Sequence, residues 1–302
     1  MSLAIATQDL TCRFGDFIAV NKVNLAIPIG QVCGFLGPNG SGKSTTIRML
    51  CGILTPTSGS GQVLGLDIVK ESERIKQEIG YMSQKFSLYH DLTVVENLEF
   101  YAGLYGLAGA EKKRRIVEMV KMANLETKQH SVVADLAGGV RQRLALGCAI
   151  LHQPKVLFLD EPTGGVDPKS RRLFWQIIYQ LAQQGTTVLV TTHFMDEVEH
   201  CDSVGFIYQG ELIAFGSVSE LKRSISGELL RITSEDSIGL LKQLKQQDIK
   251  VQDAYIHGQS LHVLIESAAV HDFAAYDYQK IEPSMEDVFA YYVKLKRGAK
   301  ND

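Results

Sequence analysis

The chain has 302 residues, enough for one large domain or two smaller ones, and its content of 45% hydrophobic and 22% charged residues is typical of a globular protein. Its formal net charge of −3 gives no electrostatic reason to expect nucleic acid or anionic lipid as a partner. The first ten residues, MSLAIATQDL, lack the basic and apolar segments of a secretory signal, and no run of about 18 apolar residues predicts a membrane span.

Two strand patterns follow one another along the chain. Residues 3–30 combine short alternating runs with turn residues, which indicates a small antiparallel layer. From Gln31 an apolar strand at residues 32–36 runs into a glycine-rich loop, and a helix begins near Lys43. Further apolar strands at residues 156–159, 187–190 and 204–207 alternate with helical stretches, so we expect a mainly parallel sheet covered on both faces, an α/β fold.

The middle and the end of the chain differ from this α/β pattern. Helical periodicity at residues 92–104, 111–123 and 141–151 predicts a helical subdomain inserted over residues 86–154. Residues 226–302 carry a strand, an amphipathic helix, two strands joined through Gly258 and a last helix from Ser284, which Asp287 completes as a capping box. We therefore expect a domain over residues 1–225 and a small α+β domain over residues 226–302.

The glycine-rich loop GPNGSGKST matches the pattern GxxxxGK[ST] between a strand and a helix. Glycines let backbone N–H groups point inward, and the helix N-terminus adds partial positive charge, so the loop is expected to bind the phosphates of ATP. Lys43 is expected to neutralise the β and γ oxygens, and the Ser44 hydroxyl to ligate Mg²⁺. The predicted ATP-binding residues here are Gly37, Pro38, Asn39, Gly40, Ser41, Gly42, Lys43, Ser44 and Thr45.

Candidate catalytic residues stand at the ends of later segments. The buried strand VLFLDE ends in two carboxylates, and we expect Asp160 to hold Mg²⁺ through its water shell and Glu161 to act as general base. His193 follows the strand TVLVTT at the carboxyl edge of the sheet, where it is expected to sense the γ-phosphate. Gln84, at the entry to the helical insert, can reach Mg²⁺ and the attacking water.

In this order the motifs resemble those of the ATP-binding subunit of ABC transporters, over residues 3 to about 225. Besides the phosphate loop, Gln84, the Asp160-Glu161 strand and His193, the segment LAGGV at residues 136–140 matches the LSGGQ-type signature, and GVD at residues 165–167 matches the D-loop. The resemblance implies a P-loop ATPase of ABC type, with an antiparallel β subdomain and an inserted helical subdomain. It also implies that an aromatic residue lies against adenine; Phe14 occupies that position, with Phe17 as the next candidate and core packing of Phe14 as an alternative.

The resemblance further implies that two nucleotide-binding domains close head to tail, with ATP between the phosphate loop of one and the signature of the other. Ala137, Gly138, Gly139 and Asp167 would then contact the partner's ATP. Ala137 and Val140 replace the serine and glutamine of LSGGQ, while the Gly138 and Gly139 amides are unaffected, so phosphate binding there is expected to be weakened but not abolished. The second nucleotide-binding domain can belong to an identical chain, as a homodimer, or to a different one, as a heterodimer.

Finer resemblance indicates exporter subunits of the drug-resistance class, carried by the runs at residues 85–89, 92–98, 191–197 and 282–289. It implies ATP hydrolysis that powers a separate transmembrane permease from the cytoplasmic face of the membrane. The surface beside Gln84 and residues 86–97 is the expected docking site, with a solvated helical face as the alternative. The accessory domain is expected either to regulate the ATPase or to stabilise the dimer.

Non-transport ATPases of the same type are the competing interpretation. DNA-maintenance ATPases carry long coiled-coil or zinc-bearing inserts, and translation ATPases join two heads with basic linkers; neither feature is evident in this sequence. A sensor that binds ATP without hydrolysing it is disfavoured by Glu161 and His193.

Overall fold

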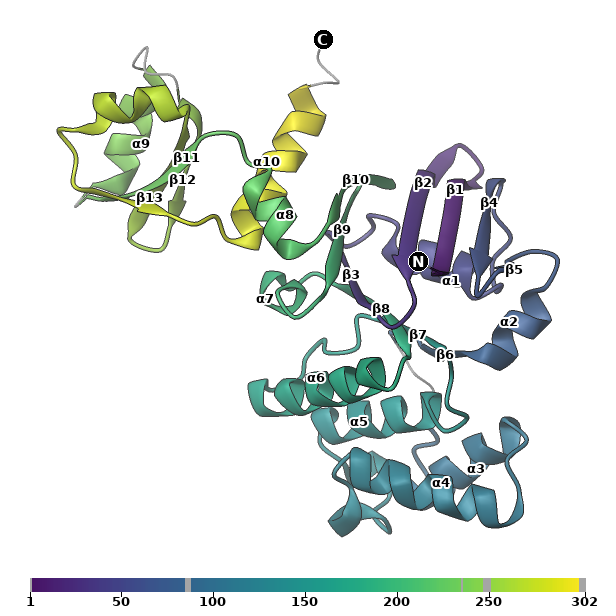
Figure 1. Ribbon diagram of the computed structural model, residues 1–302. Coiled ribbons are helices and arrows are strands. Elements are labelled where there is room, and N and C mark those ends of the chain that lie inside the picture. Colours follow the sequence, from purple (N-terminus) through teal and green to yellow (C-terminus); the bar gives the residue numbers. More distant parts are fainter. Residues whose placement is uncertain (1, 85–87, 235, 247–250, 299–302) are drawn as a thin grey trace. The chain divides into compact units, whose positions relative to one another are not determined.

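The computed structural model describes residues 2–84, 88–234, 236–246 and 251–298, and it divides into two compact units, Met1–Phe215 and Gly216–Asp302 (Figure 1). The boundary expected near residue 225 lies within the second unit, because helix α8 (Val218–Arg223) packs against helix α10 (Met285–Gly298). The hydroxyls of Ser224 and Tyr292 also share a hydrogen bond of 2.7 Å. Within the described ranges, no helix is both long and apolar enough to cross a bilayer.

The antiparallel layer expected at the N-terminus is confirmed. Strand β1 (Leu3–Phe14) pairs antiparallel with β2 (Phe17–Pro28) on one side and with β4 (Ser58–Val63) on the other. A short strand β5 (Leu66–Asp67) completes the order β2-β1-β4-β5. Strand β4 was not expected, because its sequence SGSGQV has a single apolar residue and therefore no alternating pattern.

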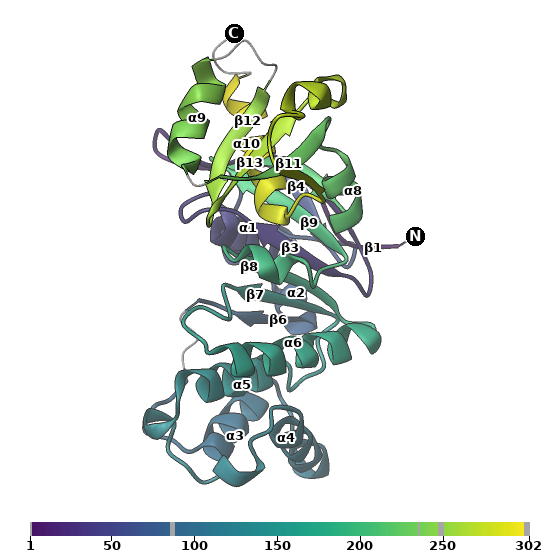
Figure 2. The ribbon, with the colours of Figure 1, turned by 90° about the vertical axis from the view of Figure 1, so that its left-hand side faces the viewer.

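The mainly parallel sheet is also confirmed, in the order β10-β9-β3-β8-β7-β6. Its members are β3 (Val32–Leu36), β6 (Ile79–Met82), β7 (Val156–Asp160), β8 (Thr187–Thr192), β9 (Ser203–Tyr208) and β10 (Glu211–Gly216). The pairs β3·β8, β3·β9, β7·β8 and β6·β7 are parallel, and Figure 2 shows these strands side by side. Every residue of β3, β7 and β8 is buried, which fits the mainly apolar sequences of β3 and β7; β8 also buries three threonines.

Helices cover both faces of this sheet. Helix α1 (Lys43–Leu50) contacts β7 on one side and β2 and β4 on the other, so the main hydrophobic core lies between the two sheets, where Phe35 and Phe158 are fully buried. On the opposite face of β3, a Cβ added to Gly34 would meet Cys201 Sγ at 2.9 Å, and helix α7 (Met195–Val198) packs there. Helix α2 (Ser72–Glu78) leads into β6.

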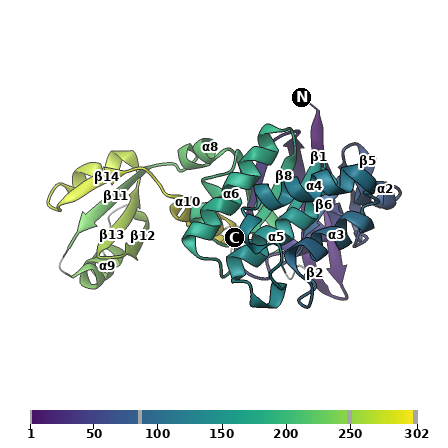
Figure 3. The same ribbon diagram turned by 90° about the horizontal axis from the view of Figure 1, so that it is seen from below.

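The helical insert contains α3 (Val94–Leu104), α4 (Gly109–Met122) and α5 (Gly138–Ala149), with 3-10 turns at Glu126–Lys128 and Val133–Asp135. Helix α3 begins with a capping box, because Thr93 accepts from the Glu96 amide and the Glu96 side chain accepts from the Thr93 amide. Helix α5 packs on α3, on α4 and on α6 (Pro168–Gln183), which returns along the sheet (Figure 3). The insert therefore connects to the sheet through α5 and α6.

The second unit has the α+β composition expected from its sequence. Strands β11 (Glu228–Thr233), β12 (Val251–His257), β13 (Ser260–Ile265) and β14 (Tyr278–Ile281) form an antiparallel sheet in the order β12-β13-β11-β14. Helix α9 (Ser237–Gln246) packs on β12 and β13. The predicted capping box of α10 is present, since the Ser284 amide donates to Asp287 Oδ2 at 2.6 Å and Ser284 Oγ accepts from the Asp287 amide at 3.3 Å. Strand β14 was not expected.

Candidate functional site

The phosphate loop, residues 37–45, joins the carboxyl end of β3 to the first turn of α1. Gly42 is the N-cap of α1 with a φ of +104°, and a Cβ there would meet the carbonyl oxygen of Ala19 at 2.4 Å. At Gly37 a Cβ would meet the carbonyl oxygen of Ile207 at 2.2 Å. Glycine is therefore required at both positions. Without side chains there, the loop backbone can pack against neighbouring carbonyl groups and curve around the N-terminus of α1, where phosphates would bind.

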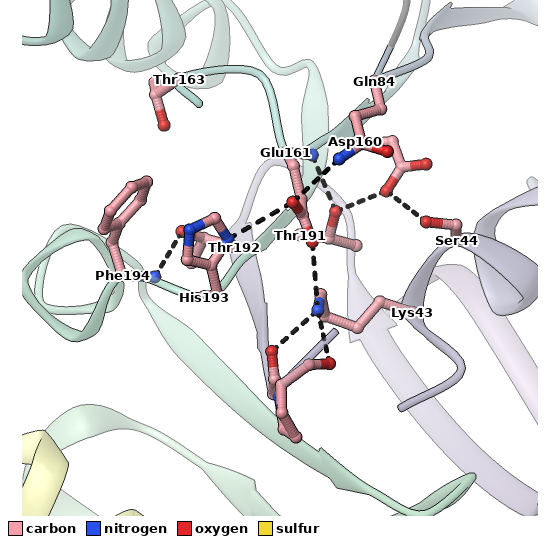
Figure 4. Close-up of polar contacts among 12 residues, drawn as sticks. Lys43, Ser44, Gln84, Asp160, Glu161, Thr163, Thr191, Thr192, His193 and Phe194 are labelled. Atoms are coloured by element: carbon pink, nitrogen blue, oxygen red, sulfur yellow. Dashed lines mark hydrogen bonds and ion pairs between the residues drawn. The ribbon is translucent and has the colours of Figure 1, made fainter. Parts of the chain in front are cut away.

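Lys43 points into this loop rather than into solvent, with only 3% of its surface exposed. Its Nζ donates to the carbonyl oxygens of Gly37 at 2.8 Å and Pro38 at 3.0 Å, and it lies 3.2 Å from Oε1 of Glu161 (Figure 4). The ammonium group is thus held at the centre of the loop, where phosphate oxygens would approach.

Asp160, the last residue of β7, is 1% exposed and receives two hydroxyl hydrogen bonds on one oxygen. Ser44 Oγ donates to its Oδ1 at 2.9 Å and Thr191 Oγ1 at 2.8 Å. Carboxylate and hydroxyl oxygens are the donors that Mg²⁺ prefers, so this pair fits the cation expected from the sequence. Thr191 was not predicted as a site residue, because nothing in its strand distinguishes it from the buried residues beside it.

Glu161 adopts a left-handed backbone conformation, with φ of +48°, and its side chain is 10% exposed. Its amide donates to Thr191 Oγ1 at 2.9 Å, which fixes the turn after β7. Its Oε2 accepts from Gln84 Nε2 at 3.2 Å and lies 3.3 Å from His193 Nδ1. The structure thus brings together the three residues expected to be catalytic, around one carboxylate (Figure 4).

An open pocket of about 460 Å³ lies beside Gln84 and Glu161. It is lined by Gln84, Glu161, the phosphate-loop residues 39–45 and two aromatic residues, Phe14 and Phe17. The aromatic side chains are 53% and 63% exposed, so core packing of Phe14 is excluded. Either ring can therefore offer a face to a purine base in the same pocket.

A second pocket of about 310 Å³ is lined by Gly138 of the signature, by Gly165 and Val166 of the D-loop, and by Gln84, which also lines the first pocket. Ala137 is the N-cap of α5, and a Cβ added to Gly139 would meet Ser170 Oγ at 2.3 Å. Asp167 is the N-cap of α6; its side chain accepts from the Ser170 amide at 2.9 Å, and hydrogen bonds from Ser170 lower its pKa. The structure therefore joins the signature to the D-loop and keeps both outside the lining of the Lys43 pocket, among the described residues.

One buried group near the site was missed in the sequence. Glu197 in α7 is 1% exposed and accepts hydrogen bonds from the hydroxyls of Thr163 and Thr192. In the sequence it stands in the polar run MDEVEH, which reads as a solvated helical face. Helix α7 has only four residues, so its sequence shows no periodic pattern that would predict the burial of Glu197.

Known proteins resemble this chain both in sequence and in structure. A model of the family described as "ABC transporter" matches residues 20–164. The chain is 50% identical over 218 residues to the probable multidrug ABC transporter ATP-binding protein YbhF of Escherichia coli K12, covering 72% of this chain but only 38% of that protein. It is 33% identical to the linearmycin resistance ATP-binding protein LnrL of Bacillus subtilis, covering 94% of this chain and 96% of the relative.

Solved structures agree with the sequence comparisons. A dimeric post-hydrolysis state of an ATP-binding cassette with ADP and Pi is 27% identical and matches with a TM-score of 0.65, covering 71% of this chain and 98% of the other. An ATP-binding subunit of an ABC transporter matches with a TM-score of 0.67 at 28% identity, covering 74% of this chain and 92% of the other. The resemblance inferred from the motifs is thereby confirmed, and the chain belongs to the family of ABC transporter ATP-binding subunits.

Proposed function

We propose that the chain is the ATP-hydrolysing subunit of an exporter, which drives a separate transmembrane subunit through nucleotide-dependent closing of two ATP-binding domains. The observation that carries this proposal is the meeting of Lys43, Glu161 and His193 at the carboxyl ends of the parallel strands β3, β7 and β8. A phosphate-binding cation, a base and a histidine beside that base are the groups that hydrolysis of a phosphoanhydride needs.

Hydrolysis is attack of water on the γ-phosphorus of ATP, which releases ADP and inorganic phosphate. The loop amides and Nζ of Lys43 bind phosphate oxygens, so the nucleotide competes with Glu161 for the positive charge that lies 3.2 Å from its carboxylate. Once released from Lys43, the Glu161 carboxylate is free to accept a proton from the attacking water. His193, beside the same carboxylate, senses the γ-phosphate and orients the base, and Gln84 helps to hold the water.

Mg²⁺ is the cation that the site is expected to take with ATP. Ser44 and Asp160 would hold it, since their oxygens lie 2.9 Å apart, and Gln84 is the third expected ligand. Bound there, the cation would neutralise charge on the β- and γ-phosphate oxygens. Thr191 keeps Asp160 in place by its hydrogen bond to Oδ1.

A second nucleotide-binding domain is the first partner. The proposal takes Ala137, Gly138, Gly139 and Asp167 as contacts to the partner's ATP. None of the four lines the pocket that contains Lys43, and Gly138 lines the pocket beside the D-loop, which supports this assignment. Dimer closing would depend on ATP because the γ-phosphate makes contacts that ADP lacks. A homodimer is expected, and a heterodimer with a second cassette would use the same surfaces.

A transmembrane permease is the second partner, and it would hold the chain at the cytoplasmic face of the membrane. We take the surface beside Gln84, with residues 86–97, as its docking site; residues 86 and 87 of this range lie outside the described residues. Tyr89 and Phe100 support this assignment. Their ring centroids lie 4.5 Å apart, and Tyr89 is 46% exposed and Phe100 43% exposed, so the pair offers an apolar surface to a partner. The alternative is that this face is solvated.

Export is supported by the relatives, whose names refer to multidrug transport and to linearmycin resistance. The chain spans about 38% of the length of the E. coli relative. We expect the permease to determine which compound is transported. The second unit would regulate hydrolysis or stabilise the dimer.

Affinity purification of the chain from detergent-solubilised membranes tests the proposal. We expect a polytopic membrane protein to copurify in stoichiometric amount, together with Mg²⁺-dependent ATPase activity that Glu161→Gln removes. A chain that hydrolyses ATP but is recovered without any membrane protein would refute the transport part, and full activity in the Glu161→Gln variant would refute the hydrolytic assignment.

A further inference from the structure

A buried carboxylate connects the two loops that carry the proposed catalytic residues. Glu197 accepts from Thr163 Oγ1 on one oxygen and from Thr192 Oγ1 at 2.6 Å on the other. Thr163 stands two residues after Glu161, and Thr192 stands one residue before His193. One side chain in α7 therefore ties the turn of the base to the strand end of the histidine.

Arg171 of α6 supplies the positive charge for this carboxylate. Its Nε lies 3.4 Å from Glu197 Oε1, and its Nη1 lies 3.2 Å from Oδ2 of the exposed Asp196. The Glu197 side chain is 1% exposed and the Arg171 side chain 23% exposed, so the pair is largely shielded from water. Because a shielded carboxylate without its partners is costly, removing either charge disturbs everything that Glu197 holds.

The same arginine reaches the histidine through Phe194. Its guanidinium carbon lies 4.6 Å from the centre of the Phe194 ring, and that ring lies 4.2 Å from the ring of His193. The Phe194 amide donates to Thr192 Oγ1 at 3.0 Å (Figure 4). The same hydroxyl donates to Glu197. The His193 side chain is 38% exposed, so burial does not fix its ring and these neighbours must.

We propose that Glu197, together with Arg171, is a positioning residue for hydrolysis: it holds Thr163 and Thr192, and through them sets the placement of Glu161 and His193. This inference rests on the proposed function, because it assigns a role toward the same reaction. Glu197 does not contact the phosphate loop and accepts no proton in the reaction; its carboxylate acts through two hydroxyls and one guanidinium.

The test is steady-state hydrolysis by the purified full chain carrying Glu197→Gln, which keeps the shape of the side chain but removes its charge. We expect kcat to fall about tenfold while KM and the affinity for ATP change less than twofold, since the phosphate loop is untouched. Arg171→Met is expected to have the same effect, and the double variant to be no slower than either single variant.

A second cycle separates positioning from general destabilisation. In a His193→Ala background, Glu197→Gln is expected to slow hydrolysis clearly less than the tenfold seen with His193 present, because one of the two residues that it positions is already gone and only the placement of Glu161 is left to disturb. Glu118→Gln is the matched control, since Glu118 pairs with the buried Arg115 in the helical insert, and it is expected to keep the wild-type kcat.

Three results would overturn the inference: an unchanged kcat in Glu197→Gln, a loss of kcat no larger than that in Glu118→Gln, or effects of Glu197→Gln and His193→Ala that simply multiply. Parallel assays of Glu161→Gln distinguish this from failure of the proposed function. If that variant is inactive while Glu197→Gln is fully active, only the inference falls; if Glu161→Gln hydrolyses ATP normally, the hydrolytic assignment falls first.

Discussion

Glu161 Oε1 lies 3.2 Å from Nζ of Lys43, although the two residues come from different strand ends of the sheet. The contact depends on the φ of +48° at Glu161, a conformation that non-glycine residues adopt rarely and that here turns its side chain back over the phosphate loop. Lys43 thus has a negatively charged partner that a phosphate can replace. In the proposed function, the same replacement would free the Glu161 carboxylate to act as the base.

Glu161→Gln should separate ATP binding from hydrolysis. Glutamine has nearly the same shape but cannot accept the proton, so hydrolysis is expected to fall by at least about a hundredfold while the ATP-bound dimer accumulates. Size-exclusion chromatography with ATP and Mg²⁺ should then give a species of twice the monomer mass, which Glu118→Gln does not form. A monomer profile unchanged by ATP would count against the closing mechanism.

Phe14 and Phe17 both line the nucleotide pocket, and the expected adenine contact is Phe14. Stacking of a base on an aromatic ring is worth about 1–3 kcal/mol, so Phe14→Ala should weaken ATP binding by about five- to a hundredfold. Isothermal titration calorimetry measures this affinity. In a separate titration, the affinity of the same variant for inorganic triphosphate, which has no base, should equal that of the wild type. If Phe17→Ala weakens ATP binding more than Phe14→Ala does, the adenine contact belongs to Phe17.

The residues that local motifs define could be predicted from the sequence, and those that depend on distant contacts could not. Lys43 and Glu161 stand in short segments whose strand, loop and helix context is visible along the chain. Glu197 acquires its role only by meeting Thr163, which is 34 positions away, and Arg171, so its own segment carries no sign of burial. The same limit applies to β4 and β14, short strands that have neighbours but no apolar pattern.

Gly139→Ala should lower stability where Gly138→Ala does not. An added Cβ at Gly139 would meet Ser170 at 2.3 Å and 2.4 Å, whereas at Gly138 it meets nothing within 4 Å among the described residues. Overpacking of this kind costs about 1–3 kcal/mol, which thermal unfolding reports as a lower midpoint. Adding Ser170→Gly should restore stability to the Gly139→Ala variant. Equal midpoints for the two alanine variants would show that α5 and α6 can move apart freely.

Lowering the pH should lower the unfolding free energy of the second unit, because His262 is buried there. This residue is 3% exposed, and burial, with the nearby charges of His257 and Arg231, lowers its pKa to about 4. Between pH 6.5 and pH 4 the unfolded chain binds a proton that the folded chain excludes, so stability falls as the pH falls, by about 2 kcal/mol at pH 5 relative to pH 7. Burial raises the pKa of the neighbouring Asp287, which offsets part of this loss.

The variant His262→Phe removes that titration and keeps an aromatic ring in place. Thermal unfolding of the full chain at pH 7 and pH 5 should show a smaller loss for this variant than for the wild type. His271→Phe, the same change at an exposed position, should leave the pH dependence as it is. An equal acid sensitivity in His262→Phe would mean that other groups cause it.

Ala137→Ser should raise the ATPase activity of a homodimer. Ala137 is the N-cap of α5, and a serine hydroxyl there can accept from a first-turn amide while donating its own proton to the partner's γ-phosphate. A hydrogen bond to a charged group is worth about 1.5–3 kcal/mol, so the affinity for ATP should rise on the order of tenfold. Ala108→Ser is the matched control, because Ala108 is the N-cap of α4, away from the signature: it should stabilise the fold without changing hydrolysis. Unchanged or lower activity in Ala137→Ser would mean that Ala137 is already suited to this dimer.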